Sequence, residues 1–212
     1  MQVTSINIGQ KRTQQNGLEI ETTGIYKFPS NEPVRITSEG IEEDFIANRK
    51  NHGGPDQAVY VYGAPDYEWW SGELAGEQSA GTFGENLTIS ELESSQVNIG
   101  DRLFISGVIL EVTAPRIPCG TLAARMNDPH FVKRFRYAER PGFYCRVLQE
   151  GSVKAGDAVK IERYGIIPIT QIYRDYFDKN KSEEMIRKYL DAPIAIRLRA
   201  ILHKELQKPA NQ

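Results

Sequence analysis

A cysteine in a loop between an expected strand and an expected helix is the residue of this sequence best placed to do chemistry. Cys119 lies in Ala114–Gly120 (APRIPCG), where two prolines stiffen the loop and Gly120 allows a tight turn beside the sulfur. Because Arg116 and a helix N-terminus are near in sequence, the pKa of the thiol is expected to fall. A thiolate is both a nucleophile and a soft metal ligand. The alternative from the local sequence is a cysteine that only fills a buried space.

The second cysteine lies in a different sequence environment. Cys145 stands inside Phe143–Val147 (FYCRV), which has the pattern of a strand, and there we expect it only to pack. With two cysteines and no CxxC pair, the sequence predicts no disulfide framework and no zinc or dithiol site. In a reducing compartment both are expected to be free thiols.

Two further loops have residues that suit an anionic ligand. Arg49–Gln57 (RKNHGGPDQ) combines cations and His52 with a glycine pair whose backbone N–H groups can bind a phosphate or a pterin. Taken alone, this segment is more typical of a charged turn, and His52 lacks the spacing of a zinc site. In Phe83–Leu87 (FGENL), the amide of Asn86 either contacts a ligand or closes a turn on its own backbone.

These loops are positioned by a series of short strands. From Val3 to about Arg163, runs rich in β-branched and aromatic residues alternate with Gly, Pro, Asn and Asp, as in antiparallel β structure. Ser106 and Gly107 indicate a two-residue hairpin turn, which favours a barrel or sandwich over a parallel sheet. The expected strands are Thr4–Gly9, Ala58–Tyr62, Leu87–Ile89, Leu103–Ile105, Ile109–Thr113, Phe143–Leu148 and Ala158–Glu162.

Helices are expected within the β region and after it. Pro65–Gly72 carries Tyr67, Trp69 and Trp70, which we expect in the core, and a second helix is expected over Thr121–Phe135. After Tyr164 the chain changes to helical periodicity, with Ser182 as a good N-cap before two glutamates. We therefore expect two domains, a β-rich domain over residues 1–163 and a small helical domain over residues 164–212. The three segments expected in the second part are Ile169–Asp178, Ser182–Asp191 and Ile194–Gln207.

Composition limits the possible partners. The chain has 212 residues, of which 40% are apolar and 25% charged, enough for one compact domain with a small appendage. Lys and Arg total 26 against 28 for Asp and Glu, so no overall field favours nucleic acid or a membrane surface. The N-terminus has no pattern of a secretory leader, and no apolar run reaches the roughly 18 residues of a membrane span. These features predict a soluble, cytoplasmic protein.

Four blocks in fixed order carry a resemblance to a known family. They span nearly the whole chain and together resemble the signature blocks of the MOSC family, in particular its YiiM-like branch of 6-N-hydroxylaminopurine resistance proteins. The blocks are Gly24–Pro29 (GIYKFP), His52–Val59 (HGGPDQAV), Phe83–Leu87 (FGENL) and Pro115–Cys119 (PRIPC).

The resemblance implies a fold and a cofactor. The fold would be mainly β, a MOSC-type β-barrel with short helices over residues 1–163, closed by a small C-terminal three-helix domain. The cofactor would be the molybdenum cofactor (molybdopterin), with no role for pyridoxal phosphate. Cys119 would be the catalytic residue and the metal ligand. Candidates for binding the cofactor are Lys27, Arg49, His52, Asn86 and Arg116.

The resemblance also implies an activity. YiiM-like proteins are associated with reducing N-hydroxylated bases to amines, so a small N-hydroxylated molecule would be the substrate. The sequence has no flavin, haem or iron–sulfur motif, so electrons would come from a separate redox protein, and a homodimer would be compatible with the family. Two alternatives need the same thiol: a carrier of sulfur as a persulfide on Cys119, and a non-catalytic module that binds the cofactor.

The sequence departs from the family pattern at two places. The block Gly40–Asp44 (GIEED) has Glu43 where the family usually has glycine, so a close backbone approach there is in doubt. After Cys119, Gly120 and Thr121 stand where many members have a bulky residue and a lysine. We therefore expect one fewer cation near the cofactor.

Overall fold

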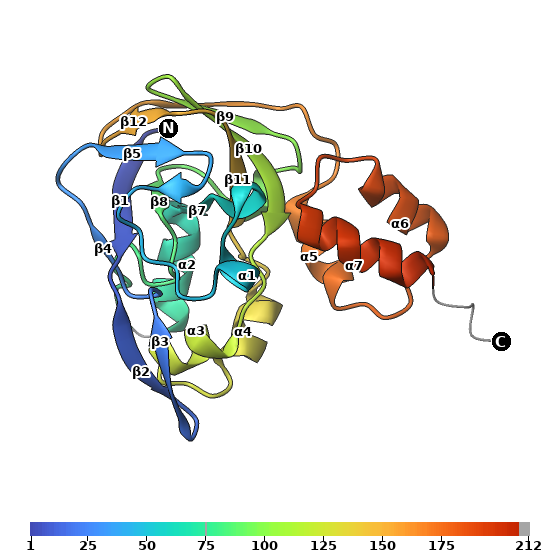
Figure 1. Ribbon diagram of the computed structural model, residues 1–212, viewed down its shortest axis with the longest axis horizontal. Coiled ribbons are helices and arrows are strands. Elements are labelled where there is room, and N and C mark those ends of the chain that lie inside the picture. Colours follow the sequence, from blue (N-terminus) through green and yellow to red (C-terminus); the bar gives the residue numbers. More distant parts are fainter. Residues whose placement is uncertain (75, 208–212) are drawn as a thin grey trace.

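The computed structural model describes residues 1–74 and 76–207. Its main element is an eight-stranded sheet in which every pair of neighbours is antiparallel except β7 and β8 (Figure 1). The antiparallel β-rich region predicted from the sequence is therefore confirmed. In spatial order the strands are β13 (Val159–Glu162), β9 (Arg102–Ile105), β10 (Val108–Pro115), β11 (Phe143–Gln149), β7 (Val59–Gly63), β8 (Leu87–Ile89), β1 (Val3–Gly9) and β4 (Lys27–Pro29).

The closed barrel expected from the resemblance is not found. The sheet has two edges, β13 and β4, and in the described part of the chain no ladder joins them. The start of β1 meets the residues just before β13 through an isolated antiparallel bridge between Gln2 and Ala158, and the Gly156 amide also donates to the Val3 carbonyl at 2.8 Å. Closure would need a continuous register between these strands, and one bridge does not supply it.

Five short strands that the sequence did not predict form two smaller sheets. They are difficult to recognise because they are short or polar: β2, for example, reads RTQQN and has no apolar alternation. The hairpin of β2 and β3 projects from the body of the molecule (Figure 1). The bounds are β2 (Arg12–Asn16), β3 (Glu19–Thr23), β5 (Val34–Thr37), β6 (Gly40–Ile41) and β12 (Gly151–Val153).

The hairpin turn at Ser106 and Gly107 is confirmed. It joins β9 and β10, and both residues have positive φ, 46° and 86° respectively, as a type I′ turn requires. Glycine meets this requirement without strain, whereas Ser106 does not. The turn sets the register of the strand that ends beside Cys119.

The structure has two helices where the sequence predicted one. Thr121–Phe135 was expected to be continuous, but α3 (Gly120–Arg125) ends before Asn127, and α4 (Phe131–Ala138) begins after Pro129. Asn127 has a φ of 49°, which ends a right-handed helix. In addition, helical backbone is disfavoured for the residue that precedes Pro129. The two other helices of this region are α1 (Arg49–His52) and α2 (Ala64–Glu73).

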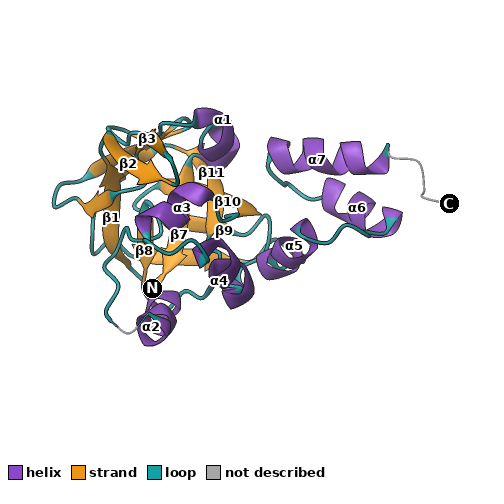
Figure 2. Cartoon of the chain, turned by 90° about the horizontal axis from the view of Figure 1, so that it is seen from below, coloured by secondary structure: helices purple, strands orange, loops and turns teal. Residues whose placement is uncertain are grey.

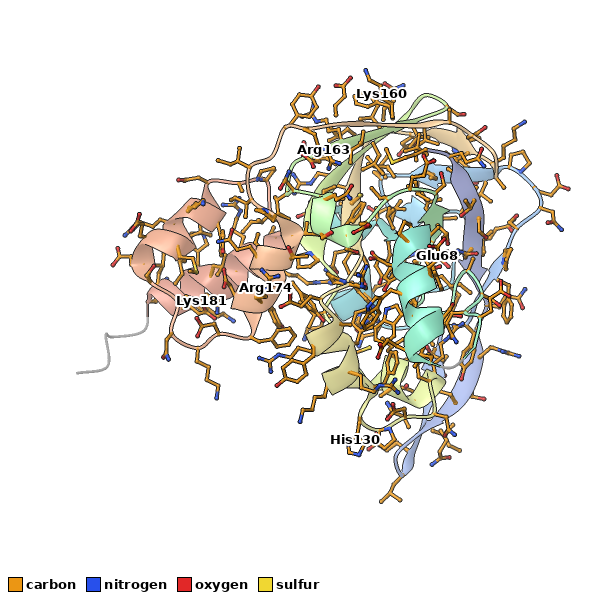
Figure 3. All side chains as sticks on the ribbon, turned by 180° about the vertical axis from the view of Figure 1, so that it is seen from behind. Glu68, His130, Lys160, Arg163, Arg174 and Lys181 are labelled. Atoms are coloured by element: carbon orange, nitrogen blue, oxygen red, sulfur yellow. The ribbon has the colours of Figure 1, made fainter. Side chains whose placement is uncertain are left out.

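An aromatic cluster lies where α2 and α4 cover the sheet. Trp70 is 1% exposed and stacks with Phe135 at 5.7 Å between ring centroids, and Phe83 and Phe131 are fully buried beside them. Tyr67 and Trp70 are in the core as predicted, and Trp69 is partly buried against the cluster. Charged side chains such as Glu68, His130 and Lys160 are exposed on the outer surface (Figure 3).

The C-terminal part is helical, as predicted. It contains α5 (Ile169–Tyr176), α6 (Glu183–Leu190) and α7 (Ile196–Leu206), which lie together beside the sheet (Figure 2). Ser182 is the predicted N-cap, since its side chain accepts a hydrogen bond from the Met185 amide at 3.2 Å. The apolar core of the sheet continues into these helices, so the division at residues 163 and 164 stays a prediction, and residues 208–212 lie outside the described part. None of the helices described is long and apolar enough to cross a bilayer.

Candidate functional site

Cys119 lies where the sequence predicted, between a strand and a helix. β10 ends at Pro115, and Cys119 is the N-cap of α3 with an extended backbone (φ −136°). Pro118 precedes it, and Gly120 begins the helix. The side chain is partly exposed, whereas Cys145 in the middle of β11 is completely buried.

The electrostatic surroundings of Cys119 favour the thiolate. Burial raises the pKa of the Cys119 thiol, but a hydrogen bond from His52 and the positive charge of Arg116 outweigh it and lower the pKa to about 6. The Arg116 Nη2 atom lies 3.8 Å from the Cys119 sulfur. At pH 7 a thiol with this pKa is roughly ten parts thiolate to one part thiol.

Arg116 is held rigidly beside the sulfur. Its side chain is 3% exposed, its Nη1 atom donates to the Ile117 carbonyl at 3.1 Å, and its guanidinium packs over the Phe135 ring at 5.6 Å. A buried guanidinium needs a negative partner. Burial alone would lower the pKa of Arg116, but the nearby Cys119 thiolate raises it above its ordinary value. Each group therefore stabilises the charge of the other.

A polar cavity of about 230 Å³ opens beside Cys119. It brings together five of the six residues that the sequence singled out, although they come from loops and strands far apart in the chain. Thr121 and the backbone of the β3–β4 connection complete the wall. The five residues are Lys27, His52, Asn86, Arg116 and Cys119.

Lys27 is buried in this cavity and paired with an acid that the sequence analysis did not single out. Its Nζ atom donates to Asp44 Oδ1 at 2.5 Å, and the Asn86 amide donates to Asp44 Oδ2 at 3.0 Å. Burial lowers the pKa of Lys27, and Asp44 opposes this effect. Asp44 also accepts from the Gly9 amide at 2.7 Å, so it links the lysine to the end of β1. Asp44 belongs to the Gly40–Asp44 block, the one signal that pointed to it.

Asn86 lines the cavity, and its neighbour Glu85 is buried behind it. The Asn86 Oδ1 atom accepts from the Tyr60 amide at 3.1 Å. Glu85 is fully buried; its Oε1 atom accepts from Gly81 N at 2.5 Å and from the Tyr67 hydroxyl at 2.7 Å, while Oε2 has no partner among the described residues. Burial raises the pKa of Glu85. Glu85 lies inside the Phe83–Leu87 block, but its place in the site was not predicted.

Arg49 is the predicted residue that the structure places elsewhere. Its side chain is 60% exposed, lies 3.9 Å from Glu39, and is not part of the cavity wall. The loop that follows it is held instead by Arg197 of α7. The Arg197 Nη2 atom donates to the carbonyls of Arg49 at 2.6 Å and Gly53 at 2.8 Å, and Nη1 donates to Gln57. A C-terminal helix therefore fixes the loop that carries His52.

The two departures from the family pattern have visible consequences. Glu43 has a φ of 68°, the left-handed conformation that glycine adopts without strain, so a non-glycine residue is held there at an energetic cost. One turn after Thr121, Arg125 of α3 donates to the Ile25 carbonyl and stacks over the Tyr26 ring at 4.8 Å. Arg125 thus binds a residue of the cavity wall without lining the cavity itself.

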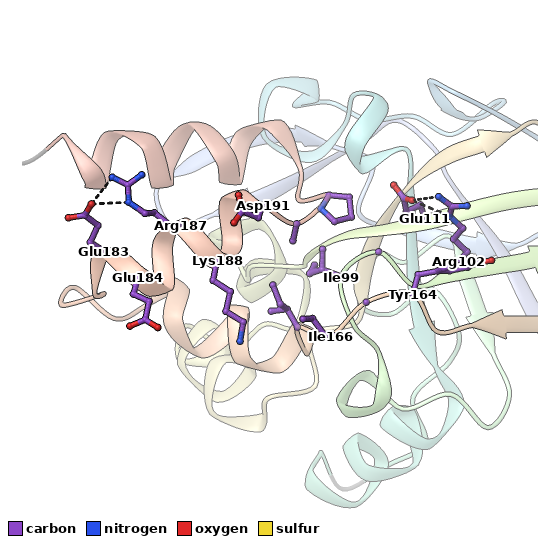
Figure 4. Close-up of a pocket in the computed structure, with 15 residues that line it drawn as sticks. Ile99, Arg102, Glu111, Tyr164, Ile166, Glu183, Glu184, Arg187, Lys188 and Asp191 are labelled. Carbon is purple, nitrogen blue, oxygen red and sulfur yellow. Dashed lines mark hydrogen bonds and ion pairs between the residues drawn. The ribbon is translucent and has the colours of Figure 1, made fainter.

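A second cavity, of about 310 Å³, also reaches Cys119 and shares His52, Gln57 and Tyr144 with the first. A larger hollow of about 1010 Å³ lies between the sheet and α6 (Figure 4), and four of its charged residues form two ion pairs, Arg102 with Glu111 at 3.0 Å and Arg187 with Glu183 at 2.6 Å. It contains neither cysteine. Within residues 1–74 and 76–207, no three His, Cys, Asp or Glu side chains are grouped as a metal site.

Comparison with known proteins agrees with this geometry. The chain is 40% identical over 155 residues to YflK of Bacillus subtilis (strain 168), covering 73% of this chain and 70% of that protein. A protein of Gibberella moniliformis named "Reductase" is 34% identical over 144 residues, covering 66% of this chain and 26% of that protein. YiiM of Escherichia coli (strain K12) is 29% identical over 140 residues, 65% of this chain and 62% of that protein.

A solved structure and a family model extend the match. The crystal structure of YiiM from Geobacillus stearothermophilus superposes with a TM-score of 0.80 at 26% identity, covering 97% of this chain and 98% of the other. The model of the MOSC domain matches residues 48–160, a range that contains His52, Asn86, Arg116 and Cys119. The chain is thus homologous to YiiM in sequence and in structure, and it belongs to the MOSC domain family.

Proposed function

We propose that this protein is a molybdenum-cofactor-dependent reductase of N-hydroxylated compounds such as 6-N-hydroxylaminopurine, with Cys119 as the protein ligand of the metal. The observation that carries the proposal is a thiol with a pKa of about 6 that opens on a cavity lined by buried cations. MOSC domains are associated with the molybdenum cofactor, and relatives of this chain are named "Reductase" and YiiM.

The donor set of the polar cavity fits this cofactor. A soft thiolate suits molybdenum, and Arg116 and Lys27 provide positive charge for a phosphate and a pterin. When bound, the cofactor would supply two-electron redox chemistry, while the protein supplies binding and orientation.

The residues of the chain prepare the thiol for this role. Arg116 and His52 keep Cys119 deprotonated at pH 7, so a metal does not have to displace a proton from the sulfur. Asn86 and Asp44 hold Lys27 at the wall of the cavity. In the proposed reaction the N–O bond of the substrate breaks, two electrons and two protons are taken up, and the products are the amine and water. A separate reduced redox protein would supply the electrons.

Anaerobic turnover tests the proposal. The full-length chain, expressed in a molybdenum-replete host, is incubated with 6-N-hydroxylaminopurine and reduced methyl viologen, and adenine is measured beside molybdenum content. The wild type and a Cys145→Ala control should both form adenine, whereas Cys119→Ser should form none. Equal turnover by Cys119→Ser, or no turnover by protein that holds stoichiometric molybdenum, would overturn the assignment.

A sulfur carrier is the second candidate, and the same low pKa of Cys119 favours it, because an accessible thiolate can attack the outer sulfur of a donor persulfide, taking over that sulfur and releasing the donor thiolate. Its signature is cyanide-labile sulfur on Cys119 in protein without molybdenum. A module that only binds the cofactor would instead hold pterin and molybdenum and form no adenine with any donor.

A further inference from the structure

One face of α4 carries positive charge around an exposed tyrosine. Lys133, Arg136 and Tyr137 stand at positions i, i+3 and i+4, the spacing of a single helix face, and all three are exposed. The Lys133 ammonium lies 6.0 Å and the Arg136 guanidinium 5.7 Å from the centre of the Tyr137 ring. The same guanidinium lies over the ring of Phe177, the C-cap of α5, at 4.2 Å, so the surface continues onto the neighbouring helix (Figure 2). We call these four residues the α4 patch.

The two cations of the α4 patch have no acidic partner within the described part of the chain. The carboxylates beside them in sequence are already engaged. Asp128 pairs with Arg134 at 3.0 Å, and Glu139 pairs with Arg174 at 2.5 Å. Residues 128–140 contain four Lys or Arg against two Asp or Glu, although the net charge of the whole protein is −2. Free cations around an exposed aromatic ring suit the surface of an acidic protein.

The inner face of α4 leads to the thiolate. Phe135 is fully buried, and the centre of its ring lies 5.6 Å from the Arg116 guanidinium. The Arg116 Nη2 atom in turn lies 3.8 Å from the Cys119 sulfur. The Tyr173 hydroxyl of α5 donates to the Phe135 carbonyl at 3.2 Å, which fixes the two helices against each other at this point. One helix therefore separates the α4 patch from the group beside the sulfur, and no residue of the patch lines either cavity that reaches Cys119.

We propose that the α4 patch is the docking site of an acidic, low-potential one-electron carrier that supplies electrons to the site at Cys119. The inference rests on the proposed function and names its partner and the surface that this partner binds. Two carriers, each oxidised by one electron, and two protons from solvent balance the cleavage of the N–O bond to the amine and water.

The place and the size of the patch suit such a carrier. The rate of electron transfer falls steeply with distance, so a carrier bound over the helix that contacts Arg116 is well placed, and it leaves both cavities open to cofactor and substrate. Electron-transfer complexes bury small interfaces, often below about 1,200 Å². A few charges around one aromatic ring are therefore enough to guide and hold the carrier.

Charge reversal tests the surface without depending on activity. The probe is a plant-type two-iron ferredoxin of strongly negative net charge, and its binding to the full-length chain is measured by biolayer interferometry. Lys133→Glu/Arg136→Glu should weaken binding at least about tenfold, and added salt should weaken the binding of the wild type. Lys154→Glu/Lys204→Glu is the matched control, because it makes the same change in net charge at two other exposed lysines without ion-pair partners among the described residues.

Three results would overturn the inference. The first is equal binding of ferredoxin by the two double variants, both shown to be folded. The second is a larger loss of binding in Arg49→Glu, because this exposed cation belongs to the loop of His52 and not to α4. The third is a single-stranded oligodeoxynucleotide that binds the wild type more tightly than ferredoxin does at the same salt, since this would change the class of partner.

Two electron donors separate this inference from the proposed function. Adenine formation from 6-N-hydroxylaminopurine is followed in protein with stoichiometric molybdenum, once with reduced ferredoxin and once with reduced methyl viologen, a small molecule that needs no docking surface. We expect Lys133→Glu/Arg136→Glu to raise the KM for ferredoxin at least about tenfold and to leave turnover with methyl viologen unchanged.

The two failures then look different. If both donors support turnover and the charge-reversed variant keeps the wild-type KM for ferredoxin, the docking site is wrong while the reductase assignment stands. If ferredoxin binds through the α4 patch but molybdenum-containing protein forms no adenine with either donor, the docking site stands while the reductase assignment fails.

Discussion

Cys119 and Cys145 lie on neighbouring parts of the fold, and their surroundings shift the pKa values of the two thiols in opposite directions. Cys119 follows the end of β10, beside Arg116 and His52, and its pKa is lowered to about 6. Cys145 lies within β11, where burial raises the pKa of its thiol well above the usual value and the charge of Glu111 raises it further. The end of a strand can be surrounded by side chains from other loops, whereas the middle of a strand is enclosed by its neighbours. Position in the sheet, more than residue type, therefore decides which thiol is reactive.

The largest expected effect is a difference in alkylation rate. At pH 7, iodoacetamide should modify Cys119 at least about a hundred times faster than Cys145, because only Cys119 is both accessible and ionised. The rate at Cys119 should rise with pH to a plateau with a midpoint near pH 6. This folded-state pKa lies below that of a free thiol, so the Cys119 thiolate contributes to the free energy of unfolding. The contribution is fully present above about pH 8.5 and is lost as the pH falls through about 6. Peptide mapping by mass spectrometry measures both sites, and equal rates would refute the comparison.

Cys145→Ser should give the next largest effect, on stability rather than reactivity. The substitution places a hydroxyl among apolar side chains of the core, where Cys145 is fully buried. An unsatisfied buried hydroxyl costs about 1–3 kcal/mol in the free energy of unfolding. Urea denaturation of the variant should show this loss, while alkylation of Cys119 stays at the wild-type rate. A variant as stable as the wild type would contradict the buried, apolar surroundings of Cys145.

His52→Ala should raise the pKa of Cys119, because His52 donates a hydrogen bond to the thiolate and adds positive charge. A rise of one pKa unit lowers the thiolate fraction at pH 7 about twofold and a rise of two units lowers it about tenfold, so alkylation there should slow by about two- to tenfold. His130→Ala is the control, since this histidine is exposed on the outer surface (Figure 3). If the two variants titrate alike, His52 does not act on the thiol.

Arg197→Ala should give a smaller shift in the same direction. Arg197 does not contact the sulfur, but it binds the carbonyls on either side of His52, at Arg49 and Gly53. Loosening this loop should raise the pKa of Cys119 by less than about one unit and therefore slow alkylation at pH 7 by less than about twofold. Arg199→Ala is the matched control, because Arg199 binds the carbonyls of Leu190 and Ala192 within the helical region. Identical titrations for the two arginine variants would show that Arg197 does not influence the pKa of Cys119.

The sequence predicted the parts of the site that depend on local pattern. The strand before Cys119, the helix after it and the turn at Ser106 follow from runs of apolar residues, prolines and glycine, and the structure confirms them. The same patterns predicted that Cys119 would lie in a loop and that Cys145 would be packed within a strand. The wrong prediction of a single helix over Thr121–Phe135 came from ignoring the break that Asn127 and Pro129 impose.

Residues that act across long separations could not be predicted. Arg197 binds a carbonyl 144 positions earlier in the chain, and helical periodicity indicated only that it stands on the polar face of its helix. In the sequence Glu85 looks like part of a polar turn. Only in the folded chain do the Tyr67 hydroxyl and the Gly81 amide donate hydrogen bonds to its carboxylate. Arg49 is the reverse case: its type and position suggested an anion site, but the short helix α1 directs its side chain toward Glu39.

The central claim is that Cys119, and not Cys145, binds the molybdenum cofactor. We would measure molybdenum by mass spectrometry and pterin by fluorescence in the wild type, Cys119→Ser and Cys145→Ala, all purified from one molybdenum-replete host. The account predicts near-stoichiometric metal and pterin in the wild type and in Cys145→Ala, and a loss of metal in Cys119→Ser. Equal metal in all three proteins, or a metal-free wild type with cyanide-labile sulfur on Cys119, would contradict it.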